Sequence, residues 1–475
     1  MRTLSAVLVL VFGCANAQSH ATEPLAPPET LAPVLVPTQP SPASPVAASP
    51  DAPYGGTLRS VEFLATTVLR KEPRSDAARV GIIRKGTRAR AVRAAPAGDG
   101  CAERWIQIAP RGWTCETAVD PSFDEPTAAG PVSLSEPDEP DLEPVVPGVY
   151  GVVRGADVQA YETRADAAAG AGRVLSGPHA VRAIGVVDVD GVRYWRTSQG
   201  KLIAASSIVQ ISPSTFRGIA LDGELPAWVR TRGDPRKPAR TRATPDPGGE
   251  VVGALAPRTI VTILAESDDG RFARINDAEW VARADLRVAA LATPPPGVGP
   301  DDRWFDIDLD DQILIAYEGE RPVYATLVST GKWRHETPAI IARVASKLER
   351  AHMISENDEP YSVADVPWTM YYDGNFALHT SYWHDGFGGP RSHGCINLAP
   401  RDARLLFRWS SPDVPPGWTA VYADEDTPGS LVRIHSRKVP DPAFRGYART
   451  LRDRGAAIAS AGSRRPRIGA SKAGQ

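Results

Sequence analysis

Short segments in which apolar and polar residues alternate, separated by glycine, proline and aspartate, recur along this 475-residue chain and constrain its fold. Successive side chains of a strand point to opposite faces, so such alternation predicts half-buried β-strands. The 45 prolines and 41 glycines favour turns and linkers over long helices. The sequence therefore predicts a mainly β protein of several domains, because the chain is too long for one core.

Three stretches, residues 57–119, 148–213 and 214–290, share one design. Each opens with a strand-like segment and a polar loop, continues with an alternating run such as "GTRARAVRA", and ends in a hairpin-like pair such as "RWIQIAPRGWTC". We interpret them as divergent repeats, each a small β-barrel. They resemble bacterial SH3-like domains, and that resemblance implies modules that bind the cell wall or other envelope proteins. Spacer domains without a ligand are the alternative.

The segments between these stretches differ in composition. Residues 18–56 are rich in proline, alanine and serine, residues 120–147 are acidic and proline-rich, and residues 291–302 form a third linker. The basic tail, residues 436–475, is expected to be a mobile extension. The formal net charge of −2 provides no overall positive field that would favour nucleic acid.

Residues 1–17 have the pattern of a signal peptide. Arg2 precedes an apolar run that ends at Gly13 and is too short to span a bilayer. Ala15-Asn16-Ala17 fits an ordinary cleavage site, whereas Val11-Phe12-Gly13-Cys14 resembles a lipobox that would leave Cys14 lipidated. Both patterns predict an exported protein in the periplasm or cell envelope, and the second predicts a lipoprotein whose only membrane contact is its lipid.

Export makes the four cysteines informative. Cys101 and Cys115 flank two short predicted strands, so we predict a disulfide that staples this hairpin and contributes about 3 kcal/mol for a loop of that size. Cys395 is then left without a partner, which calls for an explanation in an exported protein. A buried inert thiol is one explanation, and a nucleophile is another.

Cys395 lies in "FALHTSYWHDGFGGPRSHGCINL", residues 376–398, together with three of the eight histidines. A thiol becomes a good nucleophile when a nearby imidazole takes its proton. His379, His384 and His393 are the candidates for this role. Gly394 frees the backbone just before the cysteine, which suits a tight turn with amide N–H groups directed at an oxyanion.

This segment resembles the active-site motif of the YkuD-type L,D-transpeptidases: a histidine, a loop, then Ser/Thr-His-Gly-Cys, an apolar residue and Asn or Arg. Here His379 is followed by the loop and by Ser392-His393-Gly394-Cys395-Ile396-Asn397. Upstream, "VSTGKWRHETP" and "VPWTMYYDGNFALH" extend the resemblance, which predicts a β-sandwich-type catalytic domain with short helices over residues 303–435. The segment Thr337-Pro338-Ala339-Ile340-Ile341 departs from the family pattern, so the resemblance implies the family's chemistry but not its fine substrate specificity.

The resemblance implies a cysteine acyltransferase that needs no metal and no cofactor. Cys395 would be the nucleophile and His379 the base, with the Thr380 carbonyl orienting the imidazole. The backbone amides of Gly394 and Cys395 would contribute to an oxyanion hole. The remaining implied residues support the site or contact the substrate: Ser392, His393 and Asn397 in the first group, and Tyr382, Trp383 and Arg391 in the second.

The implied reaction is an attack by Cys395 on the L,D peptide bond of a peptidoglycan tetrapeptide stem, which releases D-alanine. Transfer of the acyl group to an amine of another stem gives a 3–3 cross-link, and transfer to a lysine attaches a protein to the wall. Transfer to water makes the chain an L,D-carboxypeptidase. The expected partners are stem peptides and, through the SH3-like modules, other envelope proteins, but no nucleic acid.

Three other classes compete with this interpretation. Cys395, His393, His384 and His379 are competent zinc ligands, but no Cys-x-x-Cys pair or His-Glu-x-x-His helix accompanies them. A papain-like wall endopeptidase has its cysteine before its histidine, whereas here only His435 follows Cys395. An inactive wall-binding scaffold is suggested by the three modules, but the presence of both Cys395 and His379 argues against it.

Overall fold

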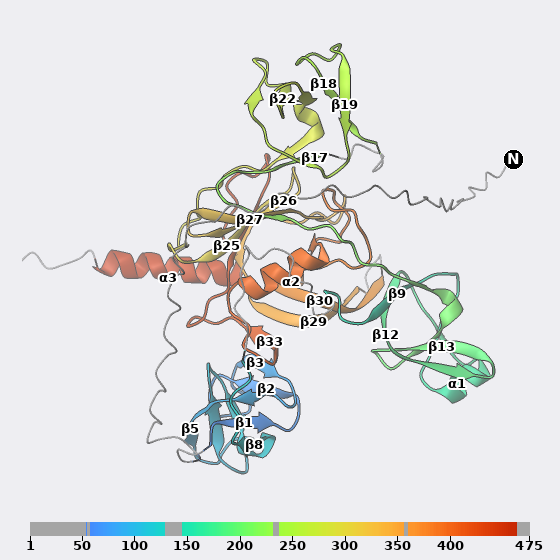
Figure 1. The fold of residues 1–475 in the computed structure, drawn as a ribbon. Helices are drawn as coiled ribbons and strands as arrows, with labels where there is room; N and C mark the ends of the chain where they lie inside the picture. Colours follow the sequence, from blue (N-terminus) through green and yellow to red (C-terminus); the bar gives the residue numbers. More distant parts are fainter. Residues whose placement is uncertain (1–53, 55–57, 129–144, 231–236, 356–359, 463–475) are drawn as a thin grey trace, which may run out of the picture. The chain divides into compact units, whose positions relative to one another are not determined.

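The computed structural model describes residues 54, 58–128, 145–230, 237–355 and 360–462, the last eight without their side chains (Figure 1). The predicted signal peptide, Cys14 and most of the linkers 18–56 and 120–147 lie outside these residues. Within the described ranges, no helix has both the length and the apolar character needed to cross a membrane. The prediction of a mainly β protein is confirmed, because strands far outnumber helices among the described elements.

Module 1, residues 57–119, has two small sheets around a core that includes Phe63, Leu69 and Ile106. In one sheet β1 pairs with β4 and β8, and in the other β2 pairs with β3 and β7 while β6 pairs with β5 and β7. The elements are β1 (Ser60–Phe63), β2 (Thr67–Arg70), β3 (Arg79–Ile83), β4 (Arg88–Ala89), β5 (Ala91–Ala95), β6 (Trp105–Ile108), β7 (Trp113–Cys115), η1 (Glu116–Ala118) and β8 (Val119–Ser122).

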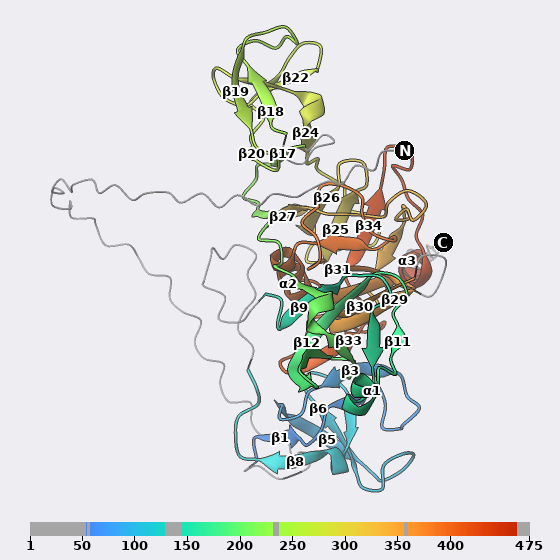
Figure 2. The ribbon, with the colours of Figure 1, turned by 90° about the vertical axis from the view of Figure 1, so that its right-hand side faces the viewer.

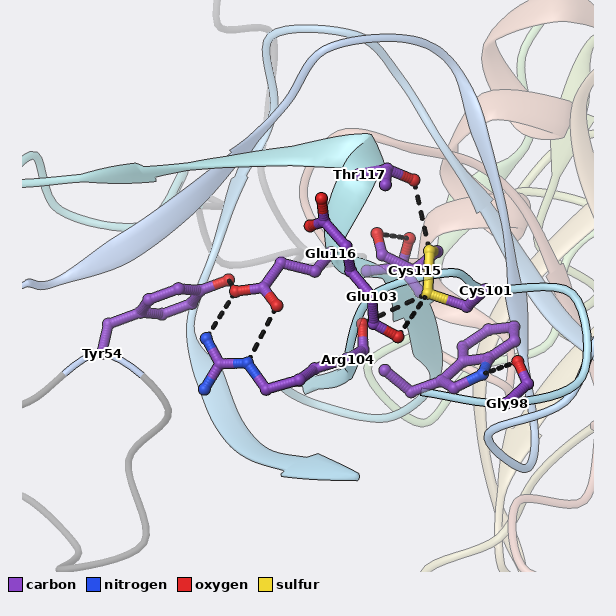
Figure 3. Close-up of a disulfide and its surroundings, with 10 residues drawn as sticks. Tyr54, Gly98, Cys101, Glu103, Arg104, Cys115, Glu116 and Thr117 are labelled. Carbon is purple, nitrogen blue, oxygen red and sulfur yellow. Dashed lines mark hydrogen bonds and ion pairs between the residues drawn. A yellow bond between two sulfur atoms is a disulfide. The ribbon is translucent and has the colours of Figure 1, made fainter. Parts of the chain in front are cut away.

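The predicted disulfide is present between Cys101 and Cys115, whose Cα atoms are 5.4 Å apart. Figure 3 shows the pair beside Glu116, which receives hydrogen bonds from Arg104 and from Tyr54. The disulfide joins the loop before β6 to the end of β7, so it closes the hairpin that these two strands form.

Module 2, residues 148–213, and module 3, residues 214–290, repeat one local pattern of module 1. In each, a hairpin strand leads into one turn of 3-10 helix and a short final strand. Module 2 contains β9 (Val149–Val153), β10 (Gln159–Tyr161), α1 (Arg164–Ala169), β11 (Arg173–Val174), β12 (His179–Val189), β13 (Val192–Thr197), β14 (Leu202–Ala204), η2 (Ala205–Ser207) and β15 (Ile208–Gln210). Module 3 contains β17 (Ala227–Val229), β18 (Ala239–Arg242), β19 (Val251–Leu255), β20 (Ile260–Val261), β21 (Ala265–Glu266), β22 (Phe272–Arg274), β23 (Trp280–Ala282), η3 (Arg283–Asp285) and β24 (Leu286–Val288) (Figure 2).

The sheets of these modules do not close into barrels, which corrects the predicted architecture. In module 3, for example, the sheet β20-β17-β24 and the sheet β19-β18-β23-β22-β21 share no strand. Each sheet keeps two edge strands, β20 and β24 in the first and β19 and β21 in the second, so no closed ring of strand pairing forms. The SH3-like identity of the modules stays a prediction.

The region predicted to be catalytic, residues 303–435, forms a β-sandwich with its flanking elements, and we call this unit the catalytic region. Its first sheet has the order β16-β27-β26-β25-β34-β28 (Figure 1). In its second sheet the order is β33-β29-β30-β31-β32. The elements are β16 (Ile219–Ala220), β25 (Arg303–Asp308), β26 (Ile313–Glu318), β27 (Arg321–Leu327), β28 (Ile341–Arg343), β29 (Ser346–Ser355), β30 (Tyr361–Asp373), β31 (Phe376–Thr380), β32 (Ile396–Leu398), α2 (Pro400–Trp409), β33 (Trp418–Tyr422), β34 (Leu431–His435) and α3 (Gly446–Gly462).

The first sheet is buried on both faces, although the alternation of its strands suggests a meander with one buried face. Phe305 and Ile307 face the core between the sheets, which also contains Met370 and Leu406. Ile315 lies in a second cluster on the opposite face, covered by apolar residues from 216–225 and 289–298. The prediction that only one face of this sheet is buried is therefore wrong, because segments predicted as linker or module 3, including β16, pack on the other face.

Two modules are hydrogen-bonded to the catalytic region rather than only tethered to it. In module 1, β3 pairs with β33, and Gly81 is needed there because a Cβ atom would lie 2.0 Å from the ring of Trp418. In module 2, the start of β12 pairs in parallel with β30, with His179 opposite Ser362. Long-range strand pairing of this kind extends the second sheet of the sandwich into both modules.

The basic tail is partly structured, which corrects the predicted mobile extension. The Phe444 ring packs in the second cluster of the first sheet, and the Arg445 N–H donates to the Ile341 carbonyl at 2.9 Å. The Tyr447 hydroxyl donates to the Asp424 carbonyl, and α3 follows. These contacts attach the beginning of the tail to the catalytic region.

Candidate active site

Two neighbouring strands bring His379 and Cys395 together. β31 and β32 pair in parallel, with Leu378 opposite Ile396 and His379 opposite Asn397. Cys395 immediately precedes β32 and therefore lies next to the strand that carries His379. Both side chains line a pocket of about 270 Å³. The complete lining is Val152, Arg154, Pro178, His179, Ala180, Met353, Tyr361, Val363, His379, Trp383, Arg391, Ser392, His393, Cys395 and Asn397.

The Cys395 thiol is neutral in this structure. Burial raises its pKa from the ordinary value of 9.0 to about 11, and the Ala377 backbone N–H opposes this shift. The Sγ atom donates to the Asn375 carbonyl at 3.6 Å. Among the residues that the structure describes, no hydrogen bond joins the thiol to His379, so the two groups must come within hydrogen-bond reach before a proton can pass between them.

The His379 ring is buried and has a defined tautomer. Its Nδ1 atom lies 2.9 Å from the Thr380 carbonyl oxygen, which can only accept, so Nδ1 carries the proton. Burial lowers the pKa of His379 to about 4, and this hydrogen bond opposes the shift. Nε2 is therefore unprotonated at neutral pH and able to accept a proton. The predicted hydrogen bond between the His379 ring and the Thr380 carbonyl is present.

The turn before Cys395 is held by hydrogen bonds with Ser392 and Thr337. The Gly394 N–H donates to Ser392 Oγ at 3.0 Å, and this hydroxyl donates to the Cys395 carbonyl at 2.6 Å. Thr337 Oγ1 donates to the Gly394 carbonyl at 2.8 Å. Gly394 has φ +113°, and a Cβ atom there would lie 2.5 Å from the Phe376 ring, so only glycine fits.

These contacts bear on the predicted oxyanion hole. In this structure the Gly394 N–H is occupied by Ser392 Oγ and is not directed at a substrate. The oxyanion role of the Gly394 and Cys395 amides stays a prediction, and for Gly394 it requires the Ser392 hydroxyl to give up this bond.

His384, the third histidine of the motif, lies outside the pocket and supports Asn397. The Gly386 N–H donates to His384 Nδ1 at 3.1 Å, so the proton of the neutral ring is on Nε2. Nε2 lies 2.9 Å from the side-chain amide of Asn397 and needs an acceptor, so the amide presents its oxygen there. One amide N–H of Asn397, a buried residue that lines the pocket, then remains for another partner.

The segment "VSTGKWRHETP" forms the wall behind the motif, a role that its resemblance alone did not reveal. Ser329 and Asn397 exchange backbone hydrogen bonds of 3.0 and 2.9 Å, and the Arg391 N–H donates to the Thr330 carbonyl at 2.8 Å. Thr337, the first residue of the atypical segment, donates the hydrogen bond to the Gly394 carbonyl. The sequence alone did not indicate the role of these residues, because they support the motif through hydrogen bonds to backbone groups of a loop that lies far along the chain.

The other predicted site residues fall into two groups. Trp383, Arg391, Ser392, His393 and Asn397 line the pocket, whereas Thr380 is buried behind His379. Tyr382 is also buried: its hydroxyl donates to the Ala364 carbonyl at 2.8 Å and its ring contacts Tyr150 at 4.3 Å. The predicted substrate contact is therefore wrong for Tyr382, which is part of the core.

Within the residues that the structure describes, no group of three or more histidine, cysteine, aspartate and glutamate side chains is arranged to hold a metal ion. The pocket combines a thiol and a neutral imidazole in a β-sandwich, and this combination suits acyl transfer through a thioester.

Comparison with known proteins identifies this domain. Residues 302–434 match the family model of the YkuD L,D-transpeptidase catalytic domain, so the chain contains a domain of this family. No curated protein matches the chain.

Several solved structures of L,D-transpeptidases are similar to part of the chain. A mutant of the Enterococcus faecium enzyme is 26% identical, with 28% of this chain and 50% of that chain covered and a TM-score of 0.23. The catalytic domain from E. faecium acylated by ertapenem is 30% identical, covering 26% and 98%, with a TM-score of 0.22. A Mycobacterium smegmatis L,D-transpeptidase is 21% identical, covering 37% and 82%, with a TM-score of 0.24. The chain thus spans about half the length of the first of these relatives.

Proposed function

We propose that this protein is a peptidoglycan L,D-transpeptidase with Cys395 as its nucleophile. The observation that carries the proposal is that Cys395 and His379 line one pocket, on paired strands, inside the segment that matches the catalytic-domain family. The sequence pattern of residues 1–17 supports a location in the cell envelope, where peptidoglycan is the available substrate.

In the first half-reaction, Cys395 Sγ attacks the carbonyl carbon of the third stem residue while its proton passes to His379 Nε2. The C–N bond to the terminal D-alanine then breaks, and His379 gives the proton to the leaving amine. The products are a thioester on Cys395 and free D-alanine. The Thr380 carbonyl keeps the proton on Nδ1 throughout, so Nε2 remains the transferring atom.

In the second half-reaction, an amine of another stem attacks the thioester and His379 takes the amine proton. Collapse forms the new amide and returns the proton to Cys395 Sγ. One amide is exchanged for another, so the cycle consumes no nucleotide. With water as the acceptor, the same steps yield a tripeptide and make the chain an L,D-carboxypeptidase.

The resting state of this pair is neutral rather than ionic. With the pKa of the thiol near 11 and that of the imidazole near 4, transfer of the proton before substrate binds costs on the order of 10 kcal/mol, before the attraction between the two charges is counted. Proton transfer therefore accompanies attack on the substrate, which makes His379 a general base.

The test is to incubate the purified chain with disaccharide-tetrapeptide, with and without EDTA, and to identify the products by mass spectrometry. We expect a cross-linked dimer that has lost one alanine, resistant to EDTA and absent from Cys395→Ala and His379→Ala. A tripeptide alone would identify a carboxypeptidase. Failure of the wild type to convert the tetrapeptide, with no covalent adduct on Cys395 from ertapenem, would favour the binding-scaffold alternative.

A further inference from the structure

The pocket that contains Cys395 has one wall from outside the catalytic domain. Five of its lining residues belong to module 2: Val152, Arg154, Pro178, His179 and Ala180. They come from the end of β9 and the start of β12, the part of β12 that pairs with β30. A module predicted to bind the cell wall or other envelope proteins therefore lines the pocket that contains Cys395.

Polar contacts hold this wall in place. Arg182 Nε donates to Asp365 Oδ2 at 2.5 Å, and the Tyr150 hydroxyl donates to the Asp365 carbonyl at 3.0 Å. Across the joint, Trp368 Nε1 donates to the Val145 carbonyl at 3.0 Å. The ion pair is largely shielded from solvent on both sides, so these contacts fix the module more firmly than a surface pair would.

Apolar and backbone packing completes the joint. Tyr150 and Ala180 of module 2 share one core with Val366 and Tyr382 of the catalytic domain. Gly177, at φ +75°, sits so close to the Pro360 carbonyl that a Cβ atom would lie 2.0 Å from the oxygen. A shared core and a close backbone approach define a fixed position for the residues just before β12.

The pocket lining is cationic. It contains Arg154 and Arg391 together with three histidines, and none of its residues is an aspartate or glutamate. Arg154 makes no ion pair with any residue in the described part of the chain, whereas Arg182 of the same module is paired with Asp365. An arginine that lines the same pocket as the thiol and has no carboxylate partner is suited to bind a carboxylate of the substrate.

We propose that module 2 is part of the active site and that Arg154 binds a side-chain carboxylate of the acyl-donor stem, on its second or third residue, rather than the terminal carboxylate of D-alanine. This inference rests on the proposed function for the identity of the substrate. A tetrapeptide stem carries carboxylates on its terminal D-alanine and on its acidic second and diamino third residues, and amidation removes those of the second and third. The chain is therefore selective for stems whose side-chain carboxylates are free.

Binding is the first test, because it does not depend on turnover. Disaccharide-tetrapeptide, in its free-carboxylate and amidated forms, is titrated calorimetrically into Cys395→Ala and into Cys395→Ala combined with Arg154→Gln. We expect Arg154→Gln to weaken binding of the free-carboxylate stem about tenfold, the lower range for a hydrogen bond to a charged group. Binding of the amidated stem should change little.

The matched control is Arg173→Gln, an exposed arginine of the same module that does not line the pocket. In the otherwise wild-type chain, Arg154→Gln should raise KM about tenfold with kcat nearly unchanged, and Arg154→Lys should restore part of the loss. Unchanged melting temperature and unchanged alkylation of Cys395 by iodoacetamide would show that the fold and the thiol are intact.

The outcomes separate this inference from the proposed function. If the wild type converts the tetrapeptide while Arg154→Gln behaves like Arg173→Gln on both stems, module 2 is no carboxylate site and the transpeptidase proposal stands. Equal losses on free and amidated stems would also overturn the carboxylate role. If the wild type neither binds nor converts either stem, the proposed function fails and this inference fails with it.

Discussion

The neutral state of the Cys395 thiol makes a quantitative prediction about its reactivity. Its pKa is raised by burial from 9.0 to about 11, so the thiolate fraction at pH 7 is about 100-fold lower than that of an ordinary cysteine. Only the thiolate reacts with alkylating agents. Iodoacetamide should therefore modify Cys395 about 100-fold more slowly than a free thiol, with a rate that rises about tenfold per pH unit between pH 7 and 9.

The assay measures the iodoacetamide rate on the purified chain by intact mass at several pH values, with N-acetylcysteine as the reference thiol and Cys395→Ser as the blank. His379→Ala should leave this rate nearly unchanged, because a neutral imidazole does not stabilise a thiolate. A rate that is already at its plateau near pH 6 and falls strongly in His379→Ala would show a thiolate–imidazolium pair. That result would refute both the neutral resting state and the general-base role derived from it.

Three further predictions follow from individual contacts. Gly394→Ala should cost about 1–3 kcal/mol of stability and reduce tetrapeptide turnover at least tenfold, measured by chemical unfolding and mass spectrometry, because its Cβ atom would meet the Phe376 ring; unchanged turnover would contradict the fit. Replacing Cys101 and Cys115 together by serine should lower the unfolding free energy of module 1 by about 3 kcal/mol while the free-thiol chemistry persists. The pKa of His384 is lowered from 6.5 to about 4, mainly by burial. Between these two pH values the ring is neutral in the folded chain and protonated in the unfolded chain. The free energy of unfolding should therefore be highest above pH 6.5 and fall by up to about 3 kcal/mol as the pH is lowered to 4. His384→Gln should flatten the acid limb of a melting-temperature profile, and an identical profile would exclude this contribution.

Local features of the chain were predictable because short-range physics determines them. Alternation placed β25 and β26, Gly319 turned the chain between β26 and β27, and Pro400 began α2. The spacing from His379 to Cys395 was readable in the same way, since both residues belong to one continuous motif. Each of these features depends on residues close together in sequence.

Features that depend on distant segments were not predictable. The second buried face of the first sheet needed apolar residues from 216–225 and 289–298 to cover it. The sequence predicts a substrate contact for Tyr382, but its ring packs against Tyr150 of module 2. The sequence predicts a mobile basic tail, but Phe444 of this tail packs against the apolar cluster on the first sheet. In each case the deciding partner lies far along the chain.

The sequence by itself predicted Cys395 as candidate nucleophile, His379 as candidate base and the disulfide, because the chemistry of a thiol, an imidazole and a cysteine pair depends on residue type and spacing. Only the tertiary structure decided what surrounds them. Thr337 supports Gly394 and Arg154 joins the wall of the pocket through strand pairing and packing between segments that share no local pattern. The environment of Cys395 is a sum of long-range contacts, and such contacts exist only once the chain has folded.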